Sequence, residues 1–346
     1  MKKIRVGIIG AGRIGRVHAG TLKRLSAAEA TAITDIDPEA ARVAAALGGI
    51  NRIEKDAARI LADPEIDAVL ICSSTDTHAD LIVQAARAGK HIFCEKPIDY
   101  DLARIDWALE AVAKSGVKLQ IGFNRRFDAN FIRVRQAIAS GEIGAPRLLH
   151  IISRDPAPPP LSYIKISGGM FFDMTIHDFD MARFLIADEV EEVYVEAAVM
   201  VDPEIGRAGD IDTAVTTLRF RNGVIGTIDN CRQAAYGYDQ RVEVLGSKGA
   251  VATANSYPNQ AVISSATEIR RDLPLNFFLE RYAESFVAEL QAFVTAIADD
   301  KPTPVSGTDA RMPVLMGMAA MRSHHEHRPV RMEEIAAKAT AGQRSA

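Results

Sequence analysis

The 346-residue sequence predicts an α/β protein with two domains: a doubly wound parallel sheet, then an α+β domain with an open, mainly antiparallel sheet. Strands and helices alternate up to residue 122, which is the pattern of a parallel sheet with right-handed crossovers. Beyond that point strand-like segments dominate and hairpin turns join them, so neighbouring strands run antiparallel. We therefore expect domains at 1–122 and 123–346, with the final helices able to pack back on the first domain.

Composition excludes several classes of protein. Hydrophobic residues make up 48% of the chain and charged residues 25%, which indicates a globular protein rather than a disordered or fibrous one. The net charge of −4 provides no basic surface for nucleic acid, and no stretch approaches the ~18 apolar residues of a membrane span. The first residues run into a glycine turn without a cleavage site, so we expect no targeting segment. Three cysteines in apolar runs indicate reduced thiols and a cytoplasmic location: Cys72, Cys94 and Cys231.

A glycine-rich turn separates the first predicted strand, residues 3–9, from a helix that runs through Leu25. Gly10 permits the tight turn, Gly12 lets the backbone approach a pyrophosphate, and Gly15 allows the helix to pack against the strand. The N–H groups and positive dipole end of the helix favour phosphate binding. This context predicts a dinucleotide site, and the alternative is a glycine-rich turn that binds no nucleotide. The predicted cofactor contacts in the turn are Gly10, Gly12, Arg13, Ile14 and Gly15.

An acidic residue, Asp35, follows the second predicted strand at residues 30–34. A carboxylate at this distance from the glycine turn accepts hydrogen bonds from the adenosine ribose and repels a 2′-phosphate. The position predicts NAD as the cofactor in preference to NADP. Asp37 competes for the same role, although Asp37 followed by Pro38 also indicates the start of a helix.

The loop at residues 73–78 follows a continuously apolar strand, residues 68–72, of the kind that is covered on both faces. Loops that follow parallel strands lie at the edge of the sheet where ligands bind. The candidate cofactor contacts in this loop are Ser73, Ser74 and His78. The open alternative is that the loop caps the next helix through Thr77 or Asp76. The alternation continues with helices at 38–47, 56–61, 78–88 and 102–114 and strands at 91–93 and 117–122.

The sequence Cys94-Glu95-Lys96-Pro97 closes the strand at 91–93 and places an ammonium group at the same edge of the sheet. Partial burial would let Lys96 hold or pass a proton. The alternative is a solvated lysine at the end of a strand.

The second domain begins with a helix at about 130–140, and strands follow at 148–152, 190–201, 213–220 and 224–230. Asn222-Gly223 suits a type I′ turn and predicts a hairpin, and a second hairpin is expected at 246–249. Late apolar residues repeat at helical spacing and predict packing faces. They are Leu279, Phe286, Leu290, Phe293 and Ile297, followed by a helix at 311–323.

A second chemical cluster follows Gly168-Gly169. A helix starting there would place Asp173 and His177 four residues apart on one face. A carboxylate beside an imidazole orients it and raises its basicity, which suits a general base. The alternatives are a helix-start carboxylate for Asp173 and a structural histidine for His177. No third ligand stands at zinc spacing, and the histidines at 324–327 indicate a solvated helix end, so we expect no metal.

Three segments together resemble the glucose-fructose oxidoreductase, inositol dehydrogenase and rhizopine-catabolism family: Gly10 to Gly15, Ala88 to Pro97, and Gly168 to His177. The resemblance spans nearly the whole chain. Residues 122–128, Asn230-Cys231 and residues 236–239 are most similar to the inositol 2-dehydrogenases.

The resemblance implies an N-terminal Rossmann domain, NAD as cofactor with Glu95 and Lys96 near it, and a homotetramer built on the second-domain sheets. It also implies a catalytic trio that maps onto Lys96, Asp173 and His177. Polyol contacts are expected from this trio and from Arg126, Arg154 and Tyr236. Arg154-Asp155 departs from the His and Asn that inositol enzymes tend to carry, which leaves the stereochemistry or charge of the polyol open.

The expected activity is oxidation of a secondary hydroxyl of a cyclic polyol, with myo-inositol as the first candidate. His177 would accept the hydroxyl proton, Asp173 would orient it, and Lys96 would hydrogen-bond the same oxygen. One rival is a family dehydrogenase for another inositol isomer, an aldose or an amino sugar. The other is a non-catalytic NAD-sensing regulator.

Overall fold

The computed structural model describes residues 3–336 and divides the chain into two compact units. The first unit comprises residues 3–127 together with Glu284–Met312, and the second comprises Asp128–Ala283 together with residues 313–336. The first unit thus extends past residue 122 and takes in a late segment of the chain. None of the helices in the described part of the chain is long and apolar enough to cross a membrane.

A five-stranded parallel sheet forms the centre of the first unit, in the order β2-β1-β3-β4-β5. This confirms the predicted parallel doubly wound arrangement. The order reverses between β1 and β3, so the loops that follow these two strands meet at the switch point where ligands bind in such sheets. The strands are β1 (Ile4–Ile9), β2 (Ala28–Thr34), β3 (Ala68–Ile71), β4 (His91–Cys94) and β5 (Leu119–Ile121).

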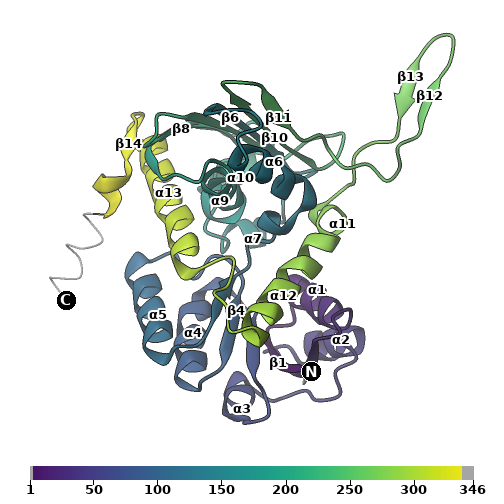
Figure 1. Ribbon diagram of the computed structural model, residues 1–346, viewed down its shortest axis with the longest axis vertical. Helices are drawn as coiled ribbons and strands as arrows, with labels where there is room; N and C mark the ends of the chain where they lie inside the picture. Colours follow the sequence, from purple (N-terminus) through teal and green to yellow (C-terminus); the bar gives the residue numbers. More distant parts are fainter. Residues whose placement is uncertain (1–2, 337–346) are drawn as a thin grey trace. The chain divides into compact units, whose positions relative to one another are not determined.

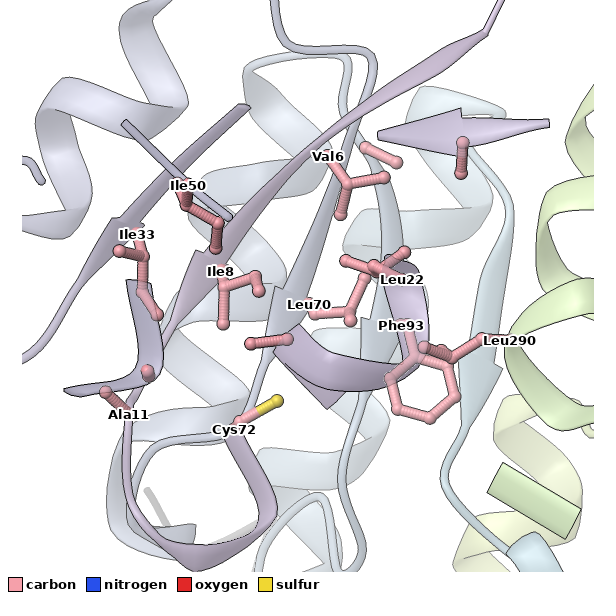
Figure 2. Close-up of a cluster of buried hydrophobic side chains, with 14 of the residues drawn as sticks. Val6, Ile8, Ala11, Leu22, Ile33, Ile50, Leu70, Cys72, Phe93 and Leu290 are labelled. Atoms are coloured by element: carbon pink, nitrogen blue, oxygen red, sulfur yellow. The ribbon is translucent and has the colours of Figure 1, made fainter. Parts of the chain in front are cut away.

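Helices pack on the sheet of the first unit, and one of them comes from the late segment. The buried side chains of Ile8, Leu70 and Phe93 on the strands meet Leu22 and Leu290 (Figure 2). Leu290 belongs to α12 (Ala283–Ala298), which carries the predicted apolar repeat from Phe286 to Ile297, whereas Leu279 lies in a separate short helix. The other helices are α1 (Arg13–Leu22), α2 (Pro38–Gly48), α3 (Ala57–Ala62), α4 (His78–Arg87), α5 (Leu102–Ser115), η1 (Thr75–Thr77) and η2 (Asn124–Phe127).

A seven-stranded sheet forms the second unit, in the order β11-β10-β6-β9-β8-β7-β14. Both predicted hairpins are present, β8–β9 and β10–β11, and Gly223 in the first turn has φ +86°. The β6–β9 pair is parallel, so the sheet is mixed but mostly antiparallel. The strands are β6 (Pro146–Arg154), β7 (Val190–Ala198), β8 (Thr213–Phe220), β9 (Ile225–Cys231), β10 (Asp239–Gly246), β11 (Ala250–Ala252) and β14 (Val330–Arg331).

Strand β7 ends at Ala198, before the predicted end at Val201, because a buried carboxylate takes over the backbone donors. Asp212 accepts from the N–H groups of Met200 at 2.7 Å and Val201 at 2.9 Å. Burial raises the pKa of Asp212, but these backbone donors outweigh it and the pKa lies below its ordinary value.

The second unit also contains a two-stranded hairpin that the sequence did not predict, β12 (Val262–Ser264) and β13 (Ile269–Arg271). It extends away from the seven-stranded sheet as a separate arm (Figure 1), and its strand residues are exposed.

The helices of the second unit are α6 (Ala129–Ala139), α7 (Leu161–Ile164), α8 (Met170–Asp173), α9 (Thr175–Ile186), α10 (Pro203–Arg207) and α11 (Phe278–Arg281). Helix α13 (Gly307–Glu326) contains the unit boundary at Met312.

A buried ion pair stabilises the start of α6. Asp128 accepts from the backbone N–H of Asn130 at 3.0 Å and from Arg281 Nη2 at 3.2 Å, and Asp128 and Arg281 are 6% and 8% exposed. Removing one partner of such a pair leaves a buried charge without compensation.

We expect Asp128→Ala to lower the free energy of unfolding by about 3 to 5 kcal/mol, since it removes the helix cap and leaves Arg281 unpaired. Asp101, which caps α5 through the N–H of Ala103 at 2.8 Å in an exposed position, is the matched control. Asp101→Ala should cost about 1 kcal/mol. Urea denaturation followed by circular dichroism measures both, and equal midpoints for the two variants would contradict the assigned role of the pair.

Candidate functional site

The glycine turn after β1 is closely packed on one side and open on the other. A Cβ at Gly10, which has φ +101°, would lie 2.4 Å from the backbone nitrogen of Ser73. A Cβ at Gly15 would lie 2.1 Å from the carbonyl oxygen of Gly10, which explains why α1 reaches the turn so closely. A Cβ at Gly12 would meet nothing within 4 Å among the described residues. The turn therefore leaves an open approach at Gly12.

The N-terminus of α1 fits an anion. Gly12 is its N-cap residue and provides no side-chain cap, and no acidic residue lies in the first turn. The N–H groups that begin at Arg13 and Ile14 and the positive end of the helix dipole suit a pyrophosphate. These residues fit a dinucleotide cofactor.

Asp35 faces this glycine turn. Its Oδ2 accepts from the backbone N–H of Ala11 at 2.5 Å and its Oδ1 from that of Asp37 at 2.8 Å. Asp37 instead caps α2 by accepting from the N–H of Glu39 at 2.9 Å. The two acids thus have different structural positions, and Asp35 is the one beside the turn.

The loop after β3 is held by its own polar groups. The hydroxyls of Ser73 and Thr77 lie 2.6 Å apart, and Thr77 Oγ1 donates to the carbonyl oxygen of Ser74. Neither Ser74, the N-cap of η1, nor Thr77, the N-cap of α4, makes a side-chain cap. His78 is 1% exposed, and its ring nitrogens lie 2.8 Å from the oxygen of Pro97 and 3.0 Å from that of Ser73. Burial lowers the pKa of His78 despite these two carbonyls.

Lys96 follows β4 and is half-buried, with a cis peptide bond to Pro97. The preceding residue, Glu95, lies with its Oε1 2.7 Å from Nε2 of His18, whose side chain is 0% exposed. Sequence reasoning missed His18. The available signal was a polar residue three positions after Gly15, on the face of α1 that packs against the sheet.

In the second unit, two donors hold the carboxylate of Asp173. Tyr163 donates its hydroxyl to Oδ1 at 2.9 Å, and Arg232 Nη1 lies 3.3 Å from Oδ2. Arg232 is 0% exposed and also pairs with Asp210 at 3.4 Å. Asp210 in turn accepts from the N–H of Met170 at 3.0 Å, at the start of α8. Sequence reasoning did not find Tyr163, ten residues before Asp173, or Arg232, 59 residues after it.

The expectation of one continuous helix from the glycines to His177 is wrong. Helix α8 ends at Asp173 and α9 begins at Thr175, with Met174 at the junction at φ −98° and ψ −63°. Asp173 is therefore the last residue of one helix and His177 lies in the first turn of the next.

The half-buried His177 lies in the first turn of α9. Hydrogen bonds between buried side chains fix this turn to the sheet. Thr175 donates to Asn230 Oδ1 at 2.8 Å, and Asn230 Nδ2 donates to Asp178 Oδ2 at 2.8 Å. Both helix residues are fully buried. These hydrogen bonds attach the start of α9 to strand β9.

Of the predicted polyol contacts outside the catalytic trio, Arg154 and Tyr236 are hydrogen-bonded to each other in the second unit, and Arg126 belongs to the first unit. Arg126, in the first unit, donates to Asp309 Oδ1 at 3.1 Å. Arg154 on β6 pairs with Asp229, with Nε 3.0 Å from Oδ1, and donates to the hydroxyl of Tyr236 at 3.1 Å. Burial and a hydrogen bond to a neighbouring carboxylate raise the pKa of Tyr236. The charge of Arg154 is thus already compensated by Asp229.

No group of three or more potential metal-ligating side chains is found among residues 3–336.

Comparison with known proteins places this geometry in a family. The model for the oxidoreductase family with an NAD-binding Rossmann fold matches residues 4–123, and that for the GFO/IDH/MocA C-terminal domain matches residues 131–252. The chain is 48% identical to the myo-inositol 2-dehydrogenase of Thermotoga maritima, covering 96% of this chain and 99% of the relative. The chain belongs to the GFO/IDH/MocA oxidoreductase family.

Two further proteins support this membership. The inositol 2-dehydrogenase of Rhizobium meliloti is 47% identical, covering 94% of this chain and 98% of the relative. The crystal structure of a probable dehydrogenase from Thermotoga maritima matches with a TM-score of 0.94 and 49% identity, over 96% of this chain and 99% of that one. As in the GFO/IDH/MocA family, the first unit is an NAD-binding Rossmann fold.

We expect Asp35→Ser to raise the ratio of kcat/KM for NADP to that for NAD by at least about tenfold, or about 1.4 kcal/mol, because the carboxylate that repels a 2′-phosphate is lost. Steady-state kinetics with both cofactors measure the ratio. Asp37→Ser, which alters only the cap of α2, should leave the ratio unchanged. An unaltered ratio in the Asp35 variant would show that this residue does not determine the preference for NAD over NADP.

Proposed function

We propose that the protein catalyses NAD-dependent oxidation of a secondary hydroxyl of a cyclic polyol, with myo-inositol converted to 2-keto-myo-inositol. The observation that carries this proposal is the 48% identity over 96% of the chain with a myo-inositol 2-dehydrogenase. The positions of Lys96, at the end of a strand in the Rossmann unit, and of Asp173 and His177, at a helix junction in the second unit, support it.

In the proposed mechanism, His177 accepts the proton of the reacting hydroxyl. Asp173 orients the imidazole and stabilises its cationic form, while Tyr163 and Arg232 hold the carboxylate of Asp173 in place. Lys96 hydrogen-bonds the hydroxyl oxygen as its charge changes. NAD, when bound, supplies the hydride acceptor.

The residues proposed to hold NAD come from the glycine turn, the end of β2 and the loops after β3 and β4. They are Gly10, Gly12, Arg13, Ile14, Gly15, Asp35, Ser73, Ser74, His78, Glu95 and Lys96. The geometry of the open Gly12 and of Asp35 beside the turn supports this assignment. Arg126, Arg154 and Tyr236 are the proposed polyol contacts, and the second unit is proposed as the substrate-binding and oligomerisation domain.

A panel of inositol isomers, aldoses and amino sugars, followed by NADH absorbance, tests the substrate. We expect myo-inositol to give the highest kcat/KM. Lys96→Met and His177→Ala should each lower kcat at least about a hundredfold, because each removes a group that acts on the reacting hydroxyl. The dissociation constant for NADH should change little in His177→Ala, because His177 is not a proposed NAD contact.

A clear preference for another compound of the panel would replace myo-inositol as the proposed substrate. Tight NADH binding without turnover of any compound would support the alternative of a non-catalytic NAD-sensing regulator. Loss of NADH binding in the His177 variant would contradict the role given to that residue.

We further propose that the protein is a cytoplasmic homotetramer whose subunits meet through the seven-stranded sheet. More buried and more exposed residues alternate along β8, β9 and β10, so residues 3–336 leave one face of the sheet partly uncovered. That face carries Val215, Ile225 and Leu245, which are 50%, 46% and 38% exposed. A second copy of the same sheet would bury these side chains.

Light scattering after gel filtration tests the assembly, with an expected mass of about four chains. Replacing Val215 and Ile225 by lysine should reduce that mass, because like charges would meet across the sheet faces. The same replacements on the exposed arm, at Ile263 and Ile269, are the control for a general effect of added charge. A wild-type mass of one chain would contradict the proposal.

A further inference from the structure

Two histidines outside the proposed catalytic trio are almost completely buried in the first unit. His18 lies on α1 and is 0% exposed, and His78 begins α4 and is 1% exposed. Burial removes the hydration of an imidazole, so its nitrogens seek partners inside the protein. The partners of these two rings include residues 95 and 97, the chain neighbours of Lys96.

His18 makes its polar contact through one nitrogen. Nε2 lies 2.7 Å from Oε1 of Glu95, and Nδ1 has no hydrogen-bond partner within the described part of the chain. The rings of Phe93 and Phe286 pack edge-on against the imidazole, with centroids 5.1 and 5.8 Å away. The aromatic contacts confine the ring, and the Nε2 contact fixes the carboxylate of Glu95 to helix α1.

The carboxylate of Glu95 is confined from a second direction. A Cβ at Gly122 would lie 2.9 Å from Oε2 of Glu95, so the carboxylate packs directly over the backbone of this glycine. The backbone N–H of Glu95 donates to the carbonyl oxygen of Ile71 at 3.0 Å. Both the main chain and the side chain of the residue before Lys96 are therefore fixed.

His78 fixes the residue after Lys96. Its Nδ1 lies 2.8 Å from the carbonyl oxygen of Pro97, and its Nε2 lies 3.0 Å from that of Ser73. A neutral imidazole donates from only one nitrogen, and the contact with Pro97 is the shorter. The ring joins the loop after β3 to the segment that carries Lys96.

We propose that His18 and His78 are positioning residues that together fix the segment 95–97 and so aim the ammonium group of Lys96. The inference rests on the proposed function, because it takes Lys96 to be catalytic. A catalytic group displaced by about 1 Å can lose about a hundredfold in rate, so such a clamp has a measurable effect on turnover.

Paired amide substitutions separate this role from general packing. The amide nitrogen of Gln occupies roughly the place of a histidine Nε2, and that of Asn the place of Nδ1. His18→Gln therefore keeps a donor for Glu95, whereas His18→Asn does not. At His78 the order reverses, because Asn keeps the donor for Pro97 and Gln keeps only that for Ser73.

We expect kcat with myo-inositol to be at least about tenfold lower in H18N than in H18Q, and likewise lower in H78Q than in H78N. The dissociation constant for NADH should differ less than about threefold within the His18 pair, since His18 is not a proposed NAD contact and the clamp acts on Lys96. Helix packing alone would not reverse the preferred amide between the two sites. Asn and Gln at the exposed His325 serve as the control pair and should not differ.

Amide hydrogen exchange over residues 94–99, measured without cofactor, provides a readout independent of turnover. Exchange should be faster in H18N and H78Q than in their partners. If a histidine variant does not fold, Gly122→Ala tests the same contact, because its Cβ would displace the carboxylate of Glu95. That variant should then show faster exchange over 94–99 and a lower kcat.

The outcomes separate the two proposals. A wild-type protein that oxidises no inositol contradicts the proposed function alone, and the exchange pattern then decides the positioning role. In an active enzyme, equal kcat or equal exchange within either pair overturns the clamp.

Discussion

The close approach of the glycine turn to the end of β3 is the contact on which the first unit depends. The Gly10 backbone lies where any side chain would collide with the backbone of Ser73, so the two loops at the switch point meet only because Gly10 is glycine. The Ala11 N–H of the same turn binds Asp35, and the carbonyl oxygen of Ser73 faces the ring of His78. A single steric constraint thus brings together the end of β2, the loop after β3 and, through His78, the segment with Lys96.

The fold was largely predictable because its signals are local. Apolar runs gave the parallel strands, and Asn222-Gly223 gave a hairpin whose turn requires a positive φ at Gly223. The parallel β6–β9 pair was not predictable, since pairing between distant strands depends on tertiary packing. The arm at β12–β13 was also missed, because its strands are short and exposed on both faces and carry no alternating pattern.

The sequence predicted which residues belong to the candidate site, but it did not predict the hydrogen bonds that hold them in place. Lys96, Asp173 and His177 stand in recognisable segments. Arg232 lies 59 residues after Asp173 and Tyr163 ten residues before it, at a separation that no helix or strand repeat predicts, although both bind its carboxylate. The break at Met174 was not predicted because the residues on both sides of it are helical and no glycine or proline marks the junction. Buried polar groups take whatever partner the fold provides, and sequence order does not reveal that partner.

The late helix α12 has a consequence for biosynthesis. Leu290 and Phe293 belong to the core that Phe93 and Leu70 begin, yet they are translated after nearly all of the second unit. A ribosome that has completed residues 1–127 has therefore released a nucleotide-binding sheet with part of its apolar surface still uncovered. Neither unit is therefore complete until late in synthesis, because the first needs residues 284–312 and the second needs residues 313–336, which follow them.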